Sequence, residues 1–158
     1  MNYRDFSAMV DTYLLFGKYP SQLEVDYLES IGITTFVDVT EEPLDPYAVS
    51  QSSRVIKYPI KDRCPPSPLT SFNKLIARLV DEVENKSAVL YIHCRGGHGR
   101  SALVAACLWM ALTKCTPLDA LTKVKAAHQQ RQIMDDRWRM GAPQTKTQLD
   151  FVRSFRVA

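Results

Sequence analysis

Residues 91–103 read YIHCRGGHGRSAL, and they decide the expected fold because a strand ends and a helix begins within them. Upstream, Ala88–Ile92 is a short apolar run without polar alternation, as expected for a strand that is covered on both faces. Downstream, Ser101–Thr113 is apolar nearly all round, which indicates a buried helix. Three glycines lie between them, more than a tight turn requires. The spacing predicts a loop that is shaped to hold a ligand.

Strands and helices are expected to alternate along the rest of the chain. Ser21 and Glu24 have the spacing of a capping box, and Gly32 follows as a stop signal. Ser67 and Pro68 look like an N-cap followed by a first helical residue. We expect strands at 33–39, 54–58 and 88–92, and helices that begin near 22, 68, 101, 117 and 145. On the first helix we expect an apolar face of Leu23, Tyr27, Leu28 and Ile31. This order predicts one α/β domain over residues 1–158, a three-layer sandwich with a mostly parallel central sheet.

Length and composition fit that expectation. The chain has 158 residues, of which 46% are hydrophobic and 23% are charged, as in an ordinary globular domain. The longest apolar run, residues 102–112, is too short to span a bilayer, and no signal-peptide pattern or lipidation motif is present. We therefore expect a soluble, cytoplasmic protein, although a nuclear location is not distinguished. The oligomeric state is not predicted.

The charges are divided unequally along the chain. Residues 1–93 carry 9 Lys/Arg against 13 Asp/Glu, whereas residues 94–158 carry 11 against 4. The basic half is either a solvated face or a surface that attracts anionic ligands to the glycine loop. No Lys/Arg run and no interleaving of aromatic with basic residues supports nucleic-acid binding.

The loop contains the groups that bind a phosphoryl group next to a nucleophile. The amides of a strand–loop–helix junction point into one concavity, together with the positive end of the helix dipole. Gly96, Gly97 and Gly99 permit the backbone angles that let successive amides converge. Arg100 adds a planar fork that matches two phosphate oxygens. Cys94 would lie at the bottom, where these groups favour the thiolate.

Two other interpretations of the loop are weaker. A metal site formed by His93, Cys94 and His98 lacks a fourth ligand and conventional spacing. The nucleotide-binding loop would require a lysine where Arg100 stands. The four cysteines form no Cys-x-x-Cys pair, and Cys107 falls within an apolar helix where core packing explains it. No metal and no cofactor is expected.

The stretch His93-Cys94-x5-Arg100-Ser101 resembles the active-site signature of the cysteine-dependent protein tyrosine phosphatases. The Gly-x-Gly that precedes Arg100 makes this match more specific than Cys-x5-Arg alone. Residues 14–17 and 31–40 are similar to the early strands of compact dual-specificity phosphatases, so the resemblance extends over the whole domain.

The resemblance implies a role for each residue of the loop. Cys94 would attack phosphorus and form a cysteinyl-phosphate that water then hydrolyses. Arg100 would bind the equatorial oxygens, and Ser101 would hydrogen-bond the sulfur as it leaves. His93 would support the loop from behind, unless it is an ordinary strand-end histidine. The other residues that would bind the phosphate are Arg95, Gly96, Gly97, His98 and Gly99.

A general acid is also implied by the resemblance. Tyr58–Ser67 resembles the acid loop of the phosphatases of regenerating liver, which carries an aspartate three residues after a proline. Asp62 stands at that position, 32 residues before Cys94. A surface aspartate in a proline-bounded turn is the alternative. Asp38 and Asp45 are less suitable, and Asp38 fits a structural role at a strand end.

A glutamine motif follows in the C-terminal part. Gln144-Thr-x-x-Gln148 resembles the motif that positions the attacking water in phosphotyrosine-specific enzymes. Thr145 and Gln148 also have the spacing of a capping box, which would give Gln148 a structural role at a helix end. Both interpretations remain open.

The substrate is less well determined than the chemistry. The chain has little room for the loop that deepens phosphotyrosine-specific pockets, so the resemblance implies a phosphoprotein phosphatase with tyrosine or dual specificity. Arg95 and His98 stand where phosphoinositide 3-phosphatases carry lysines, and positive charge there would suit a polyanion. Phosphoinositides and RNA 5′-phosphates are thus alternative substrates. A phosphate-binding module without turnover is the alternative of another class, although Cys94, Arg100 and Asp62 are all present.

Overall fold

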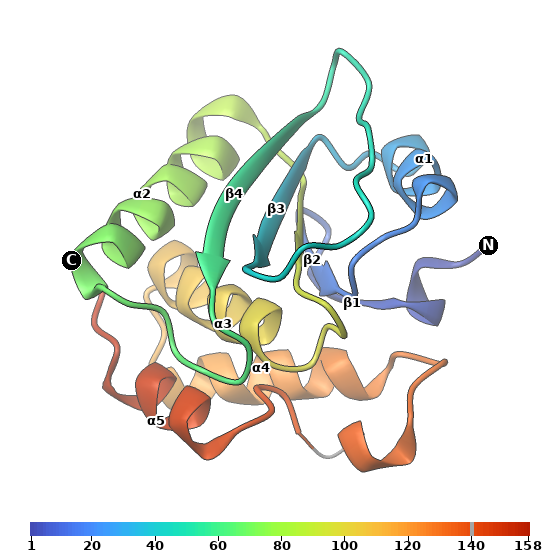
Figure 1. Cartoon of the computed structure of the whole chain (residues 1–158). Helices are drawn as coiled ribbons and strands as arrows, with labels where there is room; N and C mark the ends of the chain where they lie inside the picture. The colour runs from blue at the N-terminus through green and yellow to red at the C-terminus, as the bar shows by residue number, and fades with distance from the viewer. Residues whose placement is uncertain (140) are drawn as a thin grey trace.

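A five-stranded sheet with helices on both faces forms the centre of the computed structural model, which describes residues 1–139 and 141–158 (Figure 1). The strands are β1 (Ser7–Asp11), β2 (Leu14–Gly17), β3 (Thr35–Thr40), β4 (Arg54–Ile60) and β5 (Leu90–His93). Their order in the sheet is β1-β2-β5-β3-β4, and all neighbours are parallel except β1 and β2. The predicted α/β class and mostly parallel sheet are confirmed.

The helices form two layers of unequal size. They are α1 (Gln22–Ser30), α2 (Leu69–Lys86), α3 (Arg100–Thr113), α4 (Pro117–Gln129) and α5 (Lys146–Ser154), with short 3-10 helices at Tyr3–Asp5 and Asp136–Trp138. Helix α1 covers one face of the sheet, and the other four helices lie on the opposite face around α3 (Figure 1). No helix among the described residues is long and apolar enough to cross a membrane.

Side chains on the central strands alternate between the two layers. Leu15, Phe36 and Tyr91 pack on the side of α1, where Val25 and Leu28 are buried. Their neighbours in sequence point to the other side, against α3. Because both faces are covered, all four residues of β5 are buried, and the strand shows no alternation of buried and exposed positions.

The ends of helix α1 follow the local sequence, but its apolar face does so only in part. Ser21 and Glu24 form the predicted capping box, and Gly32 after the helix has a φ of 109°, which favours glycine. The apolar face expected for this helix is partly wrong, because Leu23 is 72% exposed and Val25 is buried instead. Ile31 is 44% exposed as well.

The start of α2 also differs from the prediction. Pro68 is the N-cap with an extended backbone, and the first helical residue is Leu69. Because Pro68 takes the N-cap position, Ser67, which is joined to it by a cis bond, lies before the helix. The face of this helix that packs against the core carries Phe72, Leu75, Ile76 and Leu79, whereas Leu69 in its first turn is exposed.

The β1 strand was not predicted, because its five residues carry neither a turn glycine nor a clear alternation. It pairs with β2 at the edge of the sheet, with an irregularity in register between Met9 and Asp11. An edge strand of this kind depends on its partner more than on its own residues.

The topology brings distant residues to one edge of the sheet. Strands β3 and β5 are parallel neighbours in which Asp38 pairs with His93. Their carboxyl ends therefore lie side by side, and the segments that follow them meet there. Residues 41–53 run from this edge alongside α1, where Gln22 exchanges two hydrogen bonds with the backbone of Ala48 (Figure 1).

Candidate active site

The glycine loop connects β5 to α3 and curls around the sulfur of Cys94. The amide of Gly97 donates to Sγ at 3.3 Å, and a hydrogen bond joins Sγ to Oγ of Ser101 at 3.3 Å. Cys94 is only 3% exposed. The first turn of α3 starts directly above the loop, so the positive end of its dipole faces the sulfur.

Two glycines of the loop are required by its geometry. Gly97 has a φ of 83°, and a Cβ there would stand 2.5 Å from the carbonyl carbon of Gly17. A Cβ on Gly99 would stand 2.9 Å from Nε2 of Gln148. The loop is thus wedged between β2 and the start of α5, which fixes the positions of its amides.

Three hydrogen bonds to the backbone hold the loop from outside. The amide of Cys94 donates to the carbonyl of Gly17 at 3.4 Å. The amide of Tyr19 donates to the carbonyl of Arg95 at 3.1 Å. Arg131 donates from Nη1 to the carbonyl of Gly96 at 2.8 Å. With its carbonyls bound outside, the loop keeps amides such as that of Gly97 directed inward.

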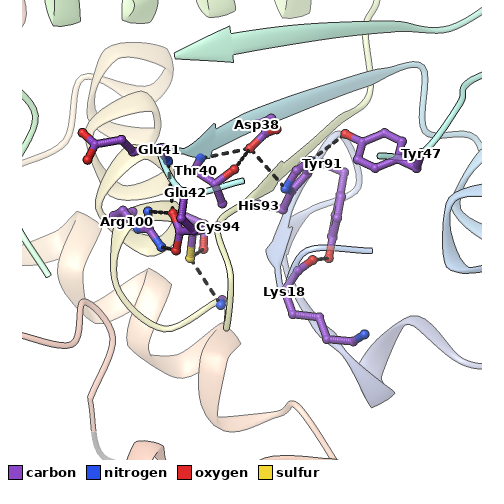
Figure 2. Close-up of polar contacts among 12 residues, drawn as sticks. Lys18, Asp38, Thr40, Glu41, Glu42, Tyr47, Tyr91, His93, Cys94 and Arg100 are labelled. Atoms are coloured by element: carbon purple, nitrogen blue, oxygen red, sulfur yellow. Dashed lines mark hydrogen bonds and ion pairs between the residues drawn. The ribbon is translucent and has the colours of Figure 1, made fainter. Parts of the chain in front are cut away.

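The guanidinium of Arg100 is held by a carboxylate that sequence analysis missed. Its Nη1 and Nη2 donate to the two carboxylate oxygens of Glu42 at 2.7 and 2.9 Å (Figure 2). Nη1 also donates to the carbonyl of Ile60 at 3.0 Å. Hydrogen bonds to Arg100 lower the pKa of Glu42 to about 2. The Nε–H of Arg100 is buried without a protein partner. That group remains available for an oxygen of a bound phosphate.

The predicted general acid reaches the same guanidinium. Oδ1 of Asp62 lies 3.4 Å from Nη2 of Arg100, and the side chain is 62% exposed. Asp62 follows the carboxyl end of β4 in a turn. The structure therefore places this carboxyl group beside the glycine loop, on the solvent side.

A buried hydrogen-bonded group supports the loop from behind. His93 is fully buried, and its Nε2 lies 2.7 Å from the hydroxyl of Tyr47 (Figure 2). Its Nδ1 is 3.8 Å from Oδ1 of Asp38, which accepts hydrogen bonds from the amide and hydroxyl of Thr40. Burial lowers the pKa of His93 to about 4, so the ring is neutral near pH 7. Asp38 has the structural strand-end position that was predicted.

His98 does not contribute the positive charge that its position in the sequence suggested. Its Nδ1 shares a hydrogen bond with Nε2 of His128 at 2.9 Å, and its ring stacks on Trp138. Burial, followed by the charge of Arg131 and the neighbouring His128, lowers the pKa of His98 to about 3. The imidazole is therefore neutral near pH 7 and packs against other rings. Arg95, by contrast, is exposed.

Arg131 is a second buried guanidinium at the loop. It is 7% exposed, and no carboxylate of the described residues forms an ion pair with it. Burial lowers the pKa of Arg131, and the neighbouring side chains of Tyr91, Cys94 and Glu24 partly oppose this effect. A cation thus lies behind the loop in addition to Arg100.

Both glutamines of the C-terminal motif lie against the loop. Gln148 is fully buried; its Oε1 accepts from the amide of Thr145 at 3.0 Å, and Thr145 caps the helix in return. The predicted capping box is therefore confirmed. The Nε2 of Gln148 has no hydrogen-bond partner and lies against Gly99. The Oε1 of Gln144 lies against the same glycine. The cap uses one end of Gln148 and leaves its amide nitrogen directed at the loop.

Sequence reasoning found the loop but missed Glu42, Tyr47 and Arg131. Glu42 and Tyr47 lie in the segment between β3 and β4, 58 and 46 residues from their partners. A usable signal was the position of this segment after a strand parallel to β5. Within residues 1–139 and 141–158, no three His, Cys, Asp or Glu side chains come close enough to hold a metal ion.

Comparison with known proteins agrees with this geometry. Residues 3–152 match the family model "PTP-SAK: Swiss Army Knife protein, DSP-PTPase phosphatase domain". The 197R protein of Invertebrate iridescent virus 6, named as a tyrosine phosphatase, is 36% identical over 150 residues, which are 92% of this chain and 51% of the viral protein. The 067L protein of Invertebrate iridescent virus 3, similarly named, is 38% identical over 156 residues, which are 94% and 64% of the two chains.

Solved structures share the fold at lower identity. The active form of Tk-PTP has a TM-score of 0.73 with 24% identity and covers 91% of both chains. PTPMT1 in complex with PI(5)P has a TM-score of 0.74 with 15% identity over 94% of this chain and 93% of its own. The chain belongs to the DSP-PTPase phosphatase family of cysteine-dependent phosphatases. It spans about half to two thirds of the length of the viral relatives.

Proposed function

We propose that this chain hydrolyses phosphate monoesters on proteins through a cysteinyl-phosphate intermediate. One arrangement carries the proposal. The amide of Gly97 donates a hydrogen bond to the sulfur of Cys94, the Nε–H of Arg100 has no protein partner, and Asp62 contacts the guanidinium of Arg100. These groups would supply a nucleophile, an anion-binding site and a proton donor to one bound phosphate.

In the first step, the Cys94 thiolate forms a bond to phosphorus and the bond from phosphorus to the ester oxygen breaks. Asp62 gives its proton to that leaving oxygen. The amides of the loop and Arg100 bind the equatorial oxygens, where charge accumulates in the transition state. Glu42 keeps the plane of the guanidinium fixed, with two hydrogen bonds.

In the second step, a water molecule attacks phosphorus and transfers a proton to Asp62, and the bond between sulfur and phosphorus breaks. Ser101, in contact with the sulfur, stabilises the thiolate that leaves. We assign the positioning of this water to Gln144 and Gln148, whose side-chain amides lie against Gly99 of the loop.

Phosphotyrosine is the substrate we favour, with phosphoserine and phosphothreonine also accepted. The polyanionic alternatives depended on two cationic side chains in the loop. His98 is neutral near pH 7 and packs on Trp138, which leaves Arg95 as the exposed cation of that pair. The geometry therefore supports a phosphoprotein over an inositol phospholipid or triphosphorylated RNA.

The test is a panel of an aryl phosphate, phosphopeptides, inositol phospholipid vesicles and triphosphorylated RNA. We expect turnover of the aryl phosphate and phosphopeptides, inhibition by vanadate, which mimics the transition state, and no effect of chelators. Cys94→Ser should abolish turnover and keep binding of a phosphopeptide, whereas Cys115→Ser, at a half-buried cysteine away from the loop, should stay active. Turnover that survives in Cys94→Ser would overturn the proposed nucleophile, and a preference for RNA or lipid by orders of magnitude would overturn the proposed substrate.

A further inference from the structure

A groove of about 760 Å³ runs between α4 and α5 on the helical side of the molecule. This volume is in the range of sites that bind small molecules or several side chains of a peptide. Its walls are largely apolar, with Leu118, Leu121, Pro143 and Leu149 among the lining residues. Leu118 is 72% exposed, so part of this apolar surface faces solvent.

The rim of the groove is positively charged. Lys125 on α4, Arg153 in the last turn of α5 and Arg156 just beyond that helix line it, and no carboxylate is among the described residues of its lining. Asp150, on the same helix as Arg153, lies 3.4 Å from that guanidinium but outside the groove. An apolar floor with cations along its edge is complementary to a segment that carries both acidic and apolar side chains.

One end of the groove meets the candidate active site. Gln144 lines the groove, and its Oε1 stands 3.3 Å from the position that a Cβ on Gly99 would occupy. The C-terminal end of α4 also lies at the loop, where His128 contacts His98. Both helices then lead away from the loop, so Arg153 and Arg156 line the end of the groove that is far from Cys94.

We propose that this groove binds an acidic, apolar segment of the phosphoprotein substrate, on one side of the phosphorylated residue. The inference rests on the proposed function and adds a second contact surface for the same substrate. A lipid fits the groove less well, since its charged head group would lie at the loop and its tails would reach the end where two arginines stand. The cations at the far end favour a peptide whose acidic residues extend beyond the catalytic pocket.

The experiment compares phosphotyrosine peptides that share one core. One peptide has neutral Gly/Ser flanks, and two others carry a Glu-Leu-Glu-Glu-Leu segment through a Gly/Ser spacer, on the N-terminal or the C-terminal side. We expect one extended peptide to have a kcat/KM about tenfold higher, mainly through KM, since exposed charge pairs and one apolar anchor contribute modestly. The gain should shrink as salt is raised.

Matched variants separate the groove from general charge. Lys125→Glu combined with Arg153→Gln should remove the gain, whereas Lys74→Glu combined with Arg78→Gln, on exposed positions of α2, lowers the net charge equally and should keep it. Leu118→Gln should reduce the gain, while Leu23→Gln, at an equally exposed leucine on α1, should not. All four variants should hydrolyse a small aryl phosphate at the wild-type rate.

Equal kcat/KM for the three peptides, or a gain that survives in the groove variant, would overturn the proposal. So would loss of hydrolysis of inositol phospholipid vesicles in the groove variant with the peptide gain intact, because a lipid would then be the occupant. If the wild type fails to hydrolyse the aryl phosphate, the proposed function is wrong. In that case, fluorescence anisotropy with the unphosphorylated Glu/Leu peptide tests the groove separately. We expect the peptide to bind the wild type and to bind the groove variant more weakly. A peptide that does not bind the wild type would overturn the docking surface.

Discussion

Glu42 accepts two hydrogen bonds from the guanidinium of Arg100, although the two residues are 58 positions apart. Arg100 is 2% exposed, so its charge would be costly without this carboxylate. Burial is the largest single effect on the pKa of Arg100 and would lower it, but the hydrogen bonds to Glu42 and the neighbouring charges, those of Glu42 and Asp62 among them, together raise it. The arginine is thereby held in one plane while its Nε–H stays free for an oxygen of the substrate.

Glu42→Gln should lower kcat/KM by roughly 10- to 100-fold, since a hydrogen bond to a charged group contributes about 1.5–3 kcal/mol. The amide keeps the shape but can accept at only one atom and carries no charge. Inhibition constants for vanadate should rise in parallel. Glu41→Gln, at the exposed neighbouring residue, is the matched control and should resemble the wild type. An active Glu42→Gln enzyme would show that Arg100 is held by its other contacts.

Asp62→Asn should lower kcat by roughly 10²–10⁴-fold for substrates with poor leaving groups, which is the usual effect of a positioned proton donor. The loss should be smaller for activated aryl phosphates, whose leaving oxygen needs no proton. Steady-state kinetics over a series of leaving groups measures this difference. Asp45→Asn, at the other loop aspartate, should leave the series unchanged. A uniform loss across the series would indicate structural damage instead of a missing acid.

The parts of the site that could be predicted are those written in contiguous sequence. The loop from Cys94 to Ser101 and the cap formed by Thr145 and Gln148 depend on residues a few positions apart, and backbone geometry fixes what such spacings can form. Asp62 was predicted as the general acid only because its loop resembles the acid loop of known phosphatases. Its contact with Arg100 now supports that assignment.

The parts that were missed depend on tertiary contacts between distant segments. Nothing local marks Glu42 or Tyr47 as special, because their roles arise when residues 41–53 fold back beside β5. His98 shows the converse case. Its position suggested a charge, but burial against His128 and Trp138 reverses that expectation. Pairing partners and burial decide such properties, and neither can be read from a single sequence.

The free energy of unfolding should fall as pH is lowered from about 6.5. Burial lowers the pKa of His93 to about 4, of His98 to about 3 and of His128 to about 4. The unfolded chain binds protons at these histidines near pH 6.5 and the native protein does not, so their stabilisation is full above that pH. Each proton contributes a slope of up to ~1.4 kcal/mol per pH unit. Glu42 extends the loss to lower pH, because its stabilisation is present above its ordinary pKa of 4.5 and disappears as pH falls toward 2.

Urea unfolding at a series of pH values measures how steeply the free energy of unfolding changes with pH. In His128→Gln this slope should be smaller by the contribution of about one proton. A free energy of unfolding that stays constant between pH 6.5 and 5 would contradict the neutral, buried state of these rings.

Arg131→Met should raise the pH midpoint for alkylation of Cys94 by about one unit. The buried guanidinium favours the thiolate over the thiol, and a change of one pH unit corresponds to ~1.4 kcal/mol of lost stabilisation. Arg131 also holds the Gly96 carbonyl, so Met should lower kcat as well. Arg131→Lys keeps the charge but not the planar fork, and it should restore the alkylation midpoint more fully than kcat. Arg137→Met removes a mostly exposed guanidinium of the same segment and should change neither quantity. An unchanged alkylation midpoint in Arg131→Met would limit this residue to packing, with the thiolate stabilised by Arg100 and the loop amides.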